Sequence, residues 1–523
     1  MENRDISYLI KQAETYLEKH DSEGFNSFID QIRVQMKLNP ESPLAGDYAH
    51  LLIVLAEKGK FEQALQMVED SGRLKNDLSN VYYNSGDDVI ERGEPEAAVE
   101  YLNKAIELNP ADTDLLGRIY FRQGYALHIT EKLDEALKAY DKAVELNPDD
   151  NELLAKVYEN KGNILGDKGE FNEAINAYTK ALEFVPEDNK HQRAHILNNI
   201  GQASGKLNKP GVEYFQEAIG LDRNLDVAHA NLGRCYLGAN NIDEAIKSLL
   251  TAIELYSKQW ESSRDIQLEA HYLSAYETLA RAYKENNEIA KAIEAYRKVI
   301  EIEPGYAEAY FWLGVLLVRQ GRADEAINAY QSAVKSYPYF TEAYYNLGNI
   351  LSEKGQVRDA IMAYQEAIEL DPDYVEAYYN LANLLSEKGE VDKAIGLYKK
   401  VIGLRPKHTM AYNNLGIAYF KKGIYTQAIG SYLKARDLAV NNMELSQIHN
   451  NLGVAYAREG SDEDAIRSYQ KAIELNSVEA HYNLGLLYKS QGKEPDAITS
   501  FRSALEFNRH FTPAQYQLQI LTA

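Results

Sequence analysis

Nine asparagines recur at one position of a repeated pattern, and their amide groups could hold another polypeptide. Three of them, Asn346, Asn380 and Asn414, follow one another at equal intervals. An amide side chain both donates and accepts hydrogen bonds, so it can bind the C=O and the N–H of an extended strand whatever the sequence of that strand. The same amides could instead satisfy neighbouring polar groups of this chain, and the sequence leaves both interpretations open. The row consists of Asn84, Asn160, Asn199, Asn231, Asn346, Asn380, Asn414, Asn451 and Asn483.

Charged and aromatic residues accompany the asparagines in two stretches of opposite character. In the C-terminal half, a glutamate recurs at the same interval as the asparagines and an aromatic residue follows three positions later: Glu308 with Phe311, Glu342 with Tyr345, and Glu376 with Tyr379. A ring beside a carboxylate favours Lys or Arg on a partner. Upstream, the equivalent positions carry Arg118, Arg122, Lys156, His195 and Arg234. This basic stretch favours acidic segments of a partner, although most exposed charges are simply solvated.

Residues suited to catalysis or metal binding do not form a recognisable motif. The segment from Gly201 to Lys206 is similar to a phosphate-binding loop, but three residues rather than four separate its glycines, and no Ser or Thr follows the lysine. The 11 histidines are scattered, and Cys235 is the only cysteine. We therefore expect no enzymatic activity, no metal, no cofactor and no disulfide.

The composition of the 523-residue chain narrows the classes of partner. Asp and Glu outnumber Lys and Arg by 79 to 56, which gives a formal charge of -23. Such a surface repels nucleic acid and anionic lipid, so neither is an expected partner. The N-terminus lacks the basic start and apolar stretch of a secretory signal, and no apolar run is long enough to span a membrane. We expect a soluble, cytoplasmic protein.

A repeating element must position these side chains, because small residues recur with the same period as the asparagines. Gly314, Gly348, Ala382 and Gly416 are evenly spaced, and an alanine lies at a constant distance after each of them, as Ala360 does after Gly348. Proline closes most units, as Pro372 closes the unit around Gly348. A fixed period of this kind predicts a solenoid of stacked structural repeats.

One unit shows how the period encodes two helices, which we call helix A and helix B. Gly348 and Ala360 have almost no side chain, so the two helices can cross closely there. Rings such as that of Tyr364 should fill the core while their hydroxyls reach the surface. The asparagine row lies two residues before each small residue, about 200° around helix A, and should face away from the packed side. The apolar stripes are Tyr344, Leu347, Gly348 and Leu351 in helix A, and Ala360, Tyr364, Ala367 and Ile368 in helix B.

These stripes, and the length of the period, closely resemble the tetratricopeptide repeat, a helix-turn-helix unit of about 34 residues. The resemblance implies an all-α fold, a right-handed superhelical solenoid of antiparallel helix pairs with about 13 units and terminal capping helices. Helix A of each unit would then line a concave groove. The units are also similar to the repeats of the O-linked N-acetylglucosamine transferases, in which a similar asparagine row holds an extended polypeptide by its backbone. We expect no counterpart of their catalytic domain, since only a short helix is predicted after Phe507.

Changes in the repeat length predict five segments. Residues 1–43 should form a degenerate helical hairpin, and residues 44–255 a first repeat segment in which several extended units add about one turn to helix A. An insertion over residues 256–273, which carries Trp260, is the best candidate for a bend. Residues 274–508 should form a second segment of regular units, and residues 509–523 a capping helix.

The resemblance also raises a specific question, namely whether the chain has the carboxylate clamp with which co-chaperones of this family bind acidic C-terminal tails. Asn84, Arg118 and Arg122 match the second and third units of such a clamp, but Ala49 and Ile53 stand where its first unit needs a lysine and an asparagine. We therefore expect a non-catalytic scaffold or adaptor that binds a protein or peptide in its groove. The alternatives are an assembly factor that uses the convex surface or the insertion near Trp260, and a co-chaperone.

Overall fold

The computed structural model describes residues 72–263 and 266–522, together with a few isolated positions upstream. The predicted N-terminal hairpin, the unit around Leu52 and the first position of the clamp at Ala49 and Ile53 lie outside the described residues. The side chains of residues 72–74 and 260–267, which include Trp260, also lie outside them.

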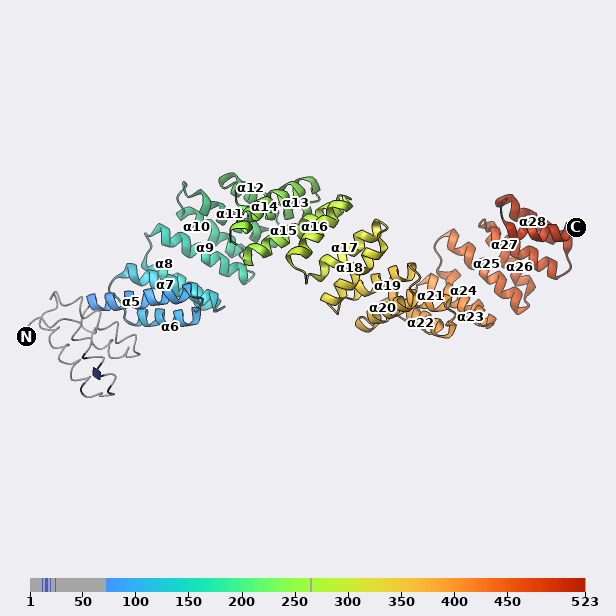
Figure 1. Cartoon of the computed structure of the whole chain (residues 1–523), viewed down its shortest axis with the longest axis horizontal. Coiled ribbons are helices and arrows are strands. Elements are labelled where there is room, and N and C mark those ends of the chain that lie inside the picture. The colour runs from blue at the N-terminus through green and yellow to red at the C-terminus, as the bar shows by residue number, and fades with distance from the viewer. Residues whose placement is uncertain are drawn as a thin grey trace, which may run out of the picture. The chain divides into compact units, whose positions relative to one another are not determined.

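The described residues form α-helices joined by short turns, without strands, and the helices alternate as A and B along the chain (Figure 1). No helix within these ranges combines the length and apolar character that crossing a bilayer requires. The A helices are α5 (Gly72–Glu91), α7 (Thr113–Ile129), α9 (Asn151–Asp167), α11 (Lys190–Lys206), α13 (Asp226–Gly238), α15 (Ile266–Glu285), α17 (Ala307–Arg319), α19 (Thr341–Glu353), α21 (Val375–Glu387), α23 (Thr409–Lys421), α25 (Asn442–Glu459) and α27 (Val478–Ser490). The B helices are α6 (Pro95–Glu107), α8 (Leu133–Leu146), α10 (Phe171–Phe184), α12 (Val212–Leu221), α14 (Ile242–Ser263), α16 (Ile289–Ile302), α18 (Ala323–Ser336), α20 (Val357–Leu370), α22 (Val391–Leu404), α24 (Tyr425–Leu438), α26 (Asp462–Glu474) and α28 (Glu494–Phe507), and α29 (Thr512–Thr522) follows them.

Each A helix packs against the following B helix through its small residue. A Cβ atom on Gly348 would lie 2.6 Å from Cε1 of Tyr364, whose side chain is only 2% exposed. The glycine is therefore needed because a tyrosine ring occupies the space beside its Cα. Ala360 is fully buried at the same crossing. The paired packing and the all-α fold confirm the predicted fold class.

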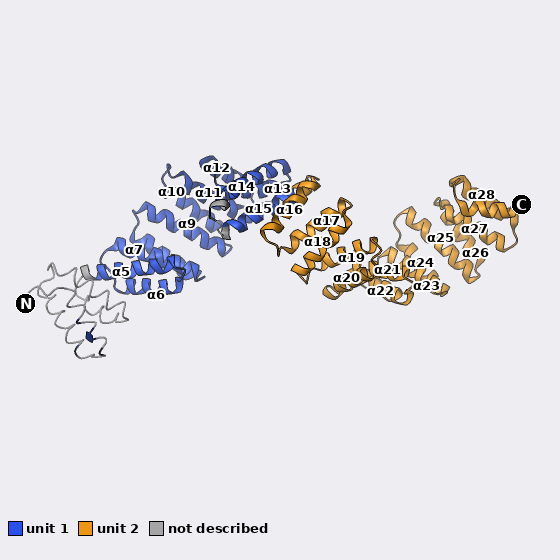
Figure 2. Cartoon of the chain, viewed as in Figure 1, with its two compact units in different colours: residues 1–282 blue, residues 283–523 orange. Residues whose placement is uncertain are grey.

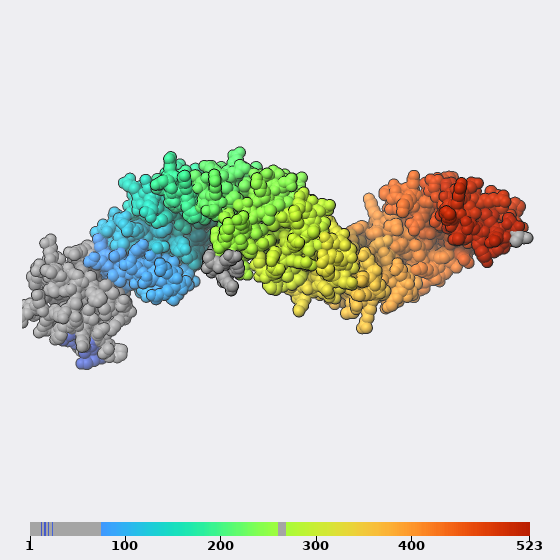
Figure 3. All heavy atoms as spheres, turned by 45° about the horizontal axis from the view of Figure 1, so that its top comes forward, coloured from blue at the N-terminus to red at the C-terminus, as the bar shows by residue number. Residues whose placement is uncertain are grey.

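The chain divides into two compact units, unit 1 over residues 1–282 and unit 2 over residues 283–523 (Figure 2). Within each unit, successive repeats form one continuous surface in the space-filling view (Figure 3). Each helix packs mainly against its neighbours in sequence, as in other solenoids.

Unit 1 contains most of the irregular repeats, although α25 in unit 2 also has 18 residues. Helices α7, α9 and α11 each have 17 residues, whereas α17, α19, α21 and α23 in unit 2 each have 13. The inserted residues between Gly233 and Ala280 lengthen two helices, because α14 has 22 residues and α15 has 20. Helix α12 has only 10 residues. A bend at residues 256–273 remains a prediction.

Candidate functional site

The amide of Asn380 is bonded to the preceding repeat rather than left free. Its Nδ2 donates to Oδ1 of Asn349 at 2.9 Å and to the hydroxyl of Tyr345 at 3.2 Å. The same Oδ1 of Asn349 accepts a hydrogen bond of 2.8 Å from the hydroxyl of Tyr364. Both N–H groups of Asn380 are therefore used, and the tyrosine hydroxyl that was expected at the surface joins this network.

The next repeat contains the same arrangement around Asn414. Its Nδ2 donates to Oδ1 of Asn383 and to the hydroxyl of Tyr379, both at 3.0 Å, and Tyr398 donates to the same Oδ1 at 2.7 Å. Burial raises the pKa of Tyr379, which stays protonated at neutral pH. The hydrogen-bonded group of two asparagines and two tyrosines thus repeats along unit 2.

Three further asparagines of the row bond to the preceding repeat through a different partner, an asparagine three positions before its small residue. These bonds join Asn231 to Asn198 at 2.8 Å, Asn451 to Asn413 at 3.1 Å, and Asn483 to Asn450 at 2.9 Å. In five of the nine members of the row, the amide N–H groups therefore bond to polar groups of the preceding repeat. For these donors, the interpretation that the amides satisfy neighbouring polar groups of the chain applies.

Within the described residues, the other members of the row do not donate to another repeat. Asn346 and Asn160 donate to carbonyl oxygens of their own helices, those of Glu342 at 3.0 Å and Lys156 at 2.8 Å. Asn84 is exposed, and Asn199 accepts from the adjacent Asn198 at 3.3 Å.

The acidic and aromatic positions of unit 2 are partly engaged as well. Glu376 forms an ion pair of 2.8 Å with Arg405, whereas Glu308 and Glu342 form no ion pair with any described residue. Each aromatic ring packs against the residue that precedes the next A helix, with centroid distances of 4.9 to 5.2 Å: Phe311 on Phe340, Tyr345 on Tyr374, and Tyr379 on His408. These rings join consecutive repeats and are only partly exposed to a ligand.

The basic positions of unit 1 are mostly neutralised by acidic side chains. Arg122 contacts Asp87 at 2.7 Å, Arg118 pairs with Asp114, and Lys156 pairs with Glu152 at 2.6 Å. The pKa of His195 is lowered, first by burial and then by the neighbouring His191, so this ring is neutral at pH 7. Arg234 is the exception among the five predicted residues, since it forms no ion pair with any described side chain.

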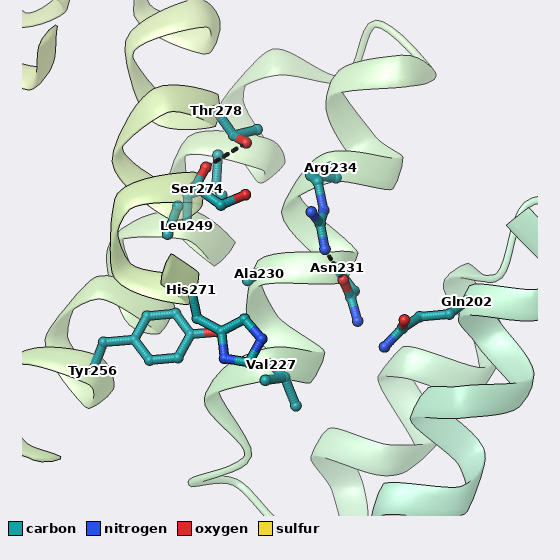
Figure 4. Close-up of a pocket in the computed structure, with 11 residues that line it drawn as sticks. Gln202, Val227, Ala230, Asn231, Arg234, Leu249, Tyr256, His271, Ser274 and Thr278 are labelled. Carbon is teal, nitrogen blue, oxygen red and sulfur yellow. Dashed lines mark hydrogen bonds between the residues drawn. The ribbon is translucent and has the colours of Figure 1, made fainter. Parts of the chain in front are cut away.

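Arg234 lies beside a cavity of about 90 Å³ within unit 1 (Figure 4). Its guanidinium donates to Oδ1 of Asn231, which is 5% exposed. Figure 4 shows Tyr256, His271 and Ser274 on the opposite side of the cavity. The lining comes from α11, α13, α14 and α15, so three A helices and the elongated B helix meet there.

A histidine pair was missed at the level of sequence. His191 and His195 lie four residues apart on α11, and their ring centroids are 4.5 Å apart. Nδ1 of His191 lies 2.8 Å from a carboxylate oxygen of Asp222. No group of three or more metal-ligating side chains was found within the described ranges. The HxxxH spacing is visible in the sequence, but the contact of His191 with Asp222 is not.

Comparison with family models gives the same repeat along most of the chain. Models described as TPR repeat or tetratricopeptide repeat match residues 79–112, 115–187, 227–259, 277–339, 329–362, 348–389, 382–423, 408–477 and 478–511. The chain belongs to the tetratricopeptide repeat family. Proteins of this family generally mediate protein–protein interactions. No match was found among curated proteins.

Several solved structures are similar to this tetratricopeptide repeat chain. MamA is 32% identical over 31% of this chain and 94% of its own, with a TM-score of 0.30. YrrB, described as a TPR protein with an unusual peptide-binding site, is 25% identical over 37% of this chain and 96% of its own, with a TM-score of 0.32. A chain of the APC/C hetero-tetramer Cut9-Hcn1 is 17% identical over 99% of this chain and 97% of its own, with a TM-score of 0.36.

Proposed function

We propose that the chain is a non-catalytic scaffold or adaptor that holds an extended segment of a partner protein along the exposed side of its A helices, which we call the A-helix face. One observation carries the proposal. Both amide N–H groups of Asn380 and one of those of Asn346 are used within the chain, whereas no described residue donates to their Oδ1 atoms. These two members of the row therefore offer amide oxygens in consecutive repeats, whereas the oxygens of three others already accept hydrogen bonds: Asn199, Asn231 and Asn414.

A row of acceptors selects the chemistry of its ligand. An extended backbone presents an N–H group from alternate residues to each side, and such groups can reach a row of amide oxygens regardless of sequence. The unpaired carboxylates of Glu308 and Glu342 add acceptors in unit 2 and favour basic side chains there. The resemblance to the asparagine row of the O-linked N-acetylglucosamine transferases supports the same proposal. We place the chain in the cytoplasm with protein partners.

The co-chaperone alternative has less support. A clamp for an acidic tail needs free cations, but Arg118 and Arg122 are paired with Asp114 and Asp87. The second alternative, an assembly role for the convex surface or the insertion, has no specific observation in its favour, and Trp260 lies outside the described side chains.

The proposal can be tested with three asparagines whose amides form no bond to another repeat within the described part of the chain. A triple variant Asn84→Ala, Asn160→Ala, Asn346→Ala removes acceptors from both units without breaking a bond to another repeat among the described residues. A library of unstructured peptides would be screened against the intact chain, and the affinity of a selected peptide measured by fluorescence anisotropy. Each lost acceptor in contact with the peptide should cost about 1 kcal/mol, or about fivefold in affinity.

A matched control replaces three exposed asparagines of B helices, Asn172→Ala, Asn176→Ala and Asn328→Ala. We expect this variant to bind as the parent does, and both variants to keep the parental helical content by circular dichroism. If the control variant loses affinity and the first variant does not, binding takes place on the B-helix side and the proposal is wrong.

A further inference from the structure

We infer that the cavity beside Arg234 binds a carboxylate, specifically the side chain of an Asp or Glu in the segment held on the A-helix face of unit 1. The inference rests on the proposed function and adds the identity of one anchoring side chain. Five observations carry it: charge, available donors, acidic neighbours, size and position.

The charge of Arg234 lacks a partner in a strongly acidic protein. The chain has a formal charge of -23, and three other basic residues of this stretch are held by carboxylates. Arg234 instead donates to the neutral amide oxygen of Asn231. A guanidinium carries five N–H donors, so most of its donors remain available for an acceptor from outside the chain.

Neutral donors lie around the same cavity. The Gln202 amide is exposed, and no described residue accepts from it or from the Ser274 hydroxyl. The hydroxyl of Thr278 donates to the carbonyl of Ser274 at 2.8 Å, so it offers its oxygen and not its proton. Donors from α11, α13 and α15 therefore surround one space, an arrangement that suits an acceptor with two oxygens.

Asp226, a carboxylate on the same helix as Arg234, is already engaged. Asp226 is 8% exposed and does not line the cavity. One of its oxygens accepts from Nε2 of Gln259 at 2.7 Å, and the other accepts from the backbone N–H of Val227 at 2.6 Å. It therefore does not occupy the position that an incoming carboxylate would take beside Arg234.

The cavity is large enough to admit a side chain. Its volume of about 90 Å³ is well above the roughly 10–15 Å³ that one water molecule needs. That space fits a carboxyl group and the methylene that bears it. Leu249 and Ala275 provide an apolar wall for the methylene, since both are buried there.

The position of the cavity favours an internal side chain over a chain end. Asn160 and Asn199 lie on α9 and α11, before the cavity along unit 1, and Asn231 lies at the cavity itself. A segment that follows this row would pass the cavity and present a side chain to it.

The experiment compares fluorescent peptides of serine and threonine that are acetylated and amidated at their ends and carry one central Glu or one central Gln. A third peptide lacks both and ends in a free carboxylate. Binding to the intact chain is measured for the parent, for Arg234→Gln and for Arg223→Gln. Arg223 is an exposed arginine of the same unit without an ion pair to a described residue, so it controls for net charge.

We expect the Glu peptide to bind about ten- to a hundredfold more tightly than the Gln peptide, as a charge-assisted hydrogen bond predicts. Arg234→Gln should abolish this difference, and Arg223→Gln should preserve it. Ser274→Ala should reduce it by a smaller factor while leaving the charge unchanged.

Four results would overturn the inference in distinguishable ways. Equal binding of the Glu and Gln peptides, with both weakened by the triple asparagine variant, refutes the carboxylate site and leaves the proposed function intact. A Glu preference that survives Arg234→Gln places the site elsewhere, and a preference for the free chain end shows that the source is a terminus. Failure of all three peptides to bind contradicts both the inference and the proposed function.

Discussion

Replacing Asn380 by alanine should destabilise unit 2, whereas the same change at Asn346 should not. Both asparagines occupy the same position of consecutive repeats, on α19 and α21. Asn380 connects two repeats through Asn349 and Tyr345, while Asn346 donates only to the carbonyl of Glu342 on its own helix. The pair therefore separates the effect of the inter-repeat bonds from the effect of changing the residue type.

The expected difference can be derived from the hydrogen bonds. Asn380→Ala removes two partly buried bonds, each of which contributes about 1 kcal/mol. Oδ1 of Asn349 keeps the bond from Tyr364, so no buried acceptor loses all its partners. Alanine favours a helix over asparagine by roughly 0.6 kcal/mol, but this gain is common to both variants and cancels in the comparison. Asn380→Ala should thus be less stable than Asn346→Ala by about 2 kcal/mol.

The assay must report local stability, because repeat proteins unfold in parts as well as globally. Native-state hydrogen exchange of α19 and α21 would be measured together with urea unfolding followed by circular dichroism. We expect reduced protection in these two helices for Asn380→Ala and parental protection for Asn346→Ala. Equal stability of the two variants would refute the assignment of the asparagine row to inter-repeat bonding.

Two further predictions concern the packing and pH dependence of unit 2. Gly348→Leu should destabilise the chain by about 3 kcal/mol, because its Cβ would lie 2.6 Å from the Tyr364 ring, whereas Gly396→Leu, with nothing within 4 Å, should be neutral or stabilising in urea unfolding. His408 accepts from the backbone N–H of Ala411 through Nδ1, and burial, followed by the nearby Arg405, lowers its pKa from 6.5. Its neutral form is favoured on folding, so its contribution is present above about pH 6.5 and is lost as pH falls through the folded pKa. His408→Asn should flatten the decline of the urea midpoint between about pH 7 and pH 5, and an unchanged decline would contradict this assignment.

The fold could be predicted because packing in a solenoid is local. Gly348, Ala360 and Tyr364 lie close together in the sequence and recur with a fixed period, so their spacing alone encodes the helix pair. The sequence predicted only part of the reason why a glycine occupies position 348. Sequence spacing shows that a small residue lies at the crossing, but the ring of Tyr364 against its Cα follows from the depth of the crossing.

Which side chains of the candidate site are already paired could not be predicted from the sequence, because their partners lie in other repeats. Arg122 and Asp87 are 35 residues apart in sequence, and their contact cancels a charge that the sequence shows as free. The same holds for Glu376 and Arg405, which are 29 residues apart. Position on a helix face indicates where a side chain points, but ion pairing depends on the rotamers of neighbouring repeats.

The asparagine row shows why a repeated polar residue can serve structure and recognition together. An amide has two ends: in Asn380 the N–H groups fix the spacing of two repeats, and the oxygen remains as an acceptor. A repeat whose asparagine bonds only within its own helix, such as that of Asn346, loses no bond to another repeat when the amide is removed. Variants at such positions measure binding alone, whereas variants at Asn380 or Asn414 change binding and repeat spacing at once. If the whole row were replaced, a loss of affinity could come either from a lost contact with the ligand or from a distorted surface. The asparagines that bond to another repeat and those that bond only within their own helix therefore have to be replaced in separate variants.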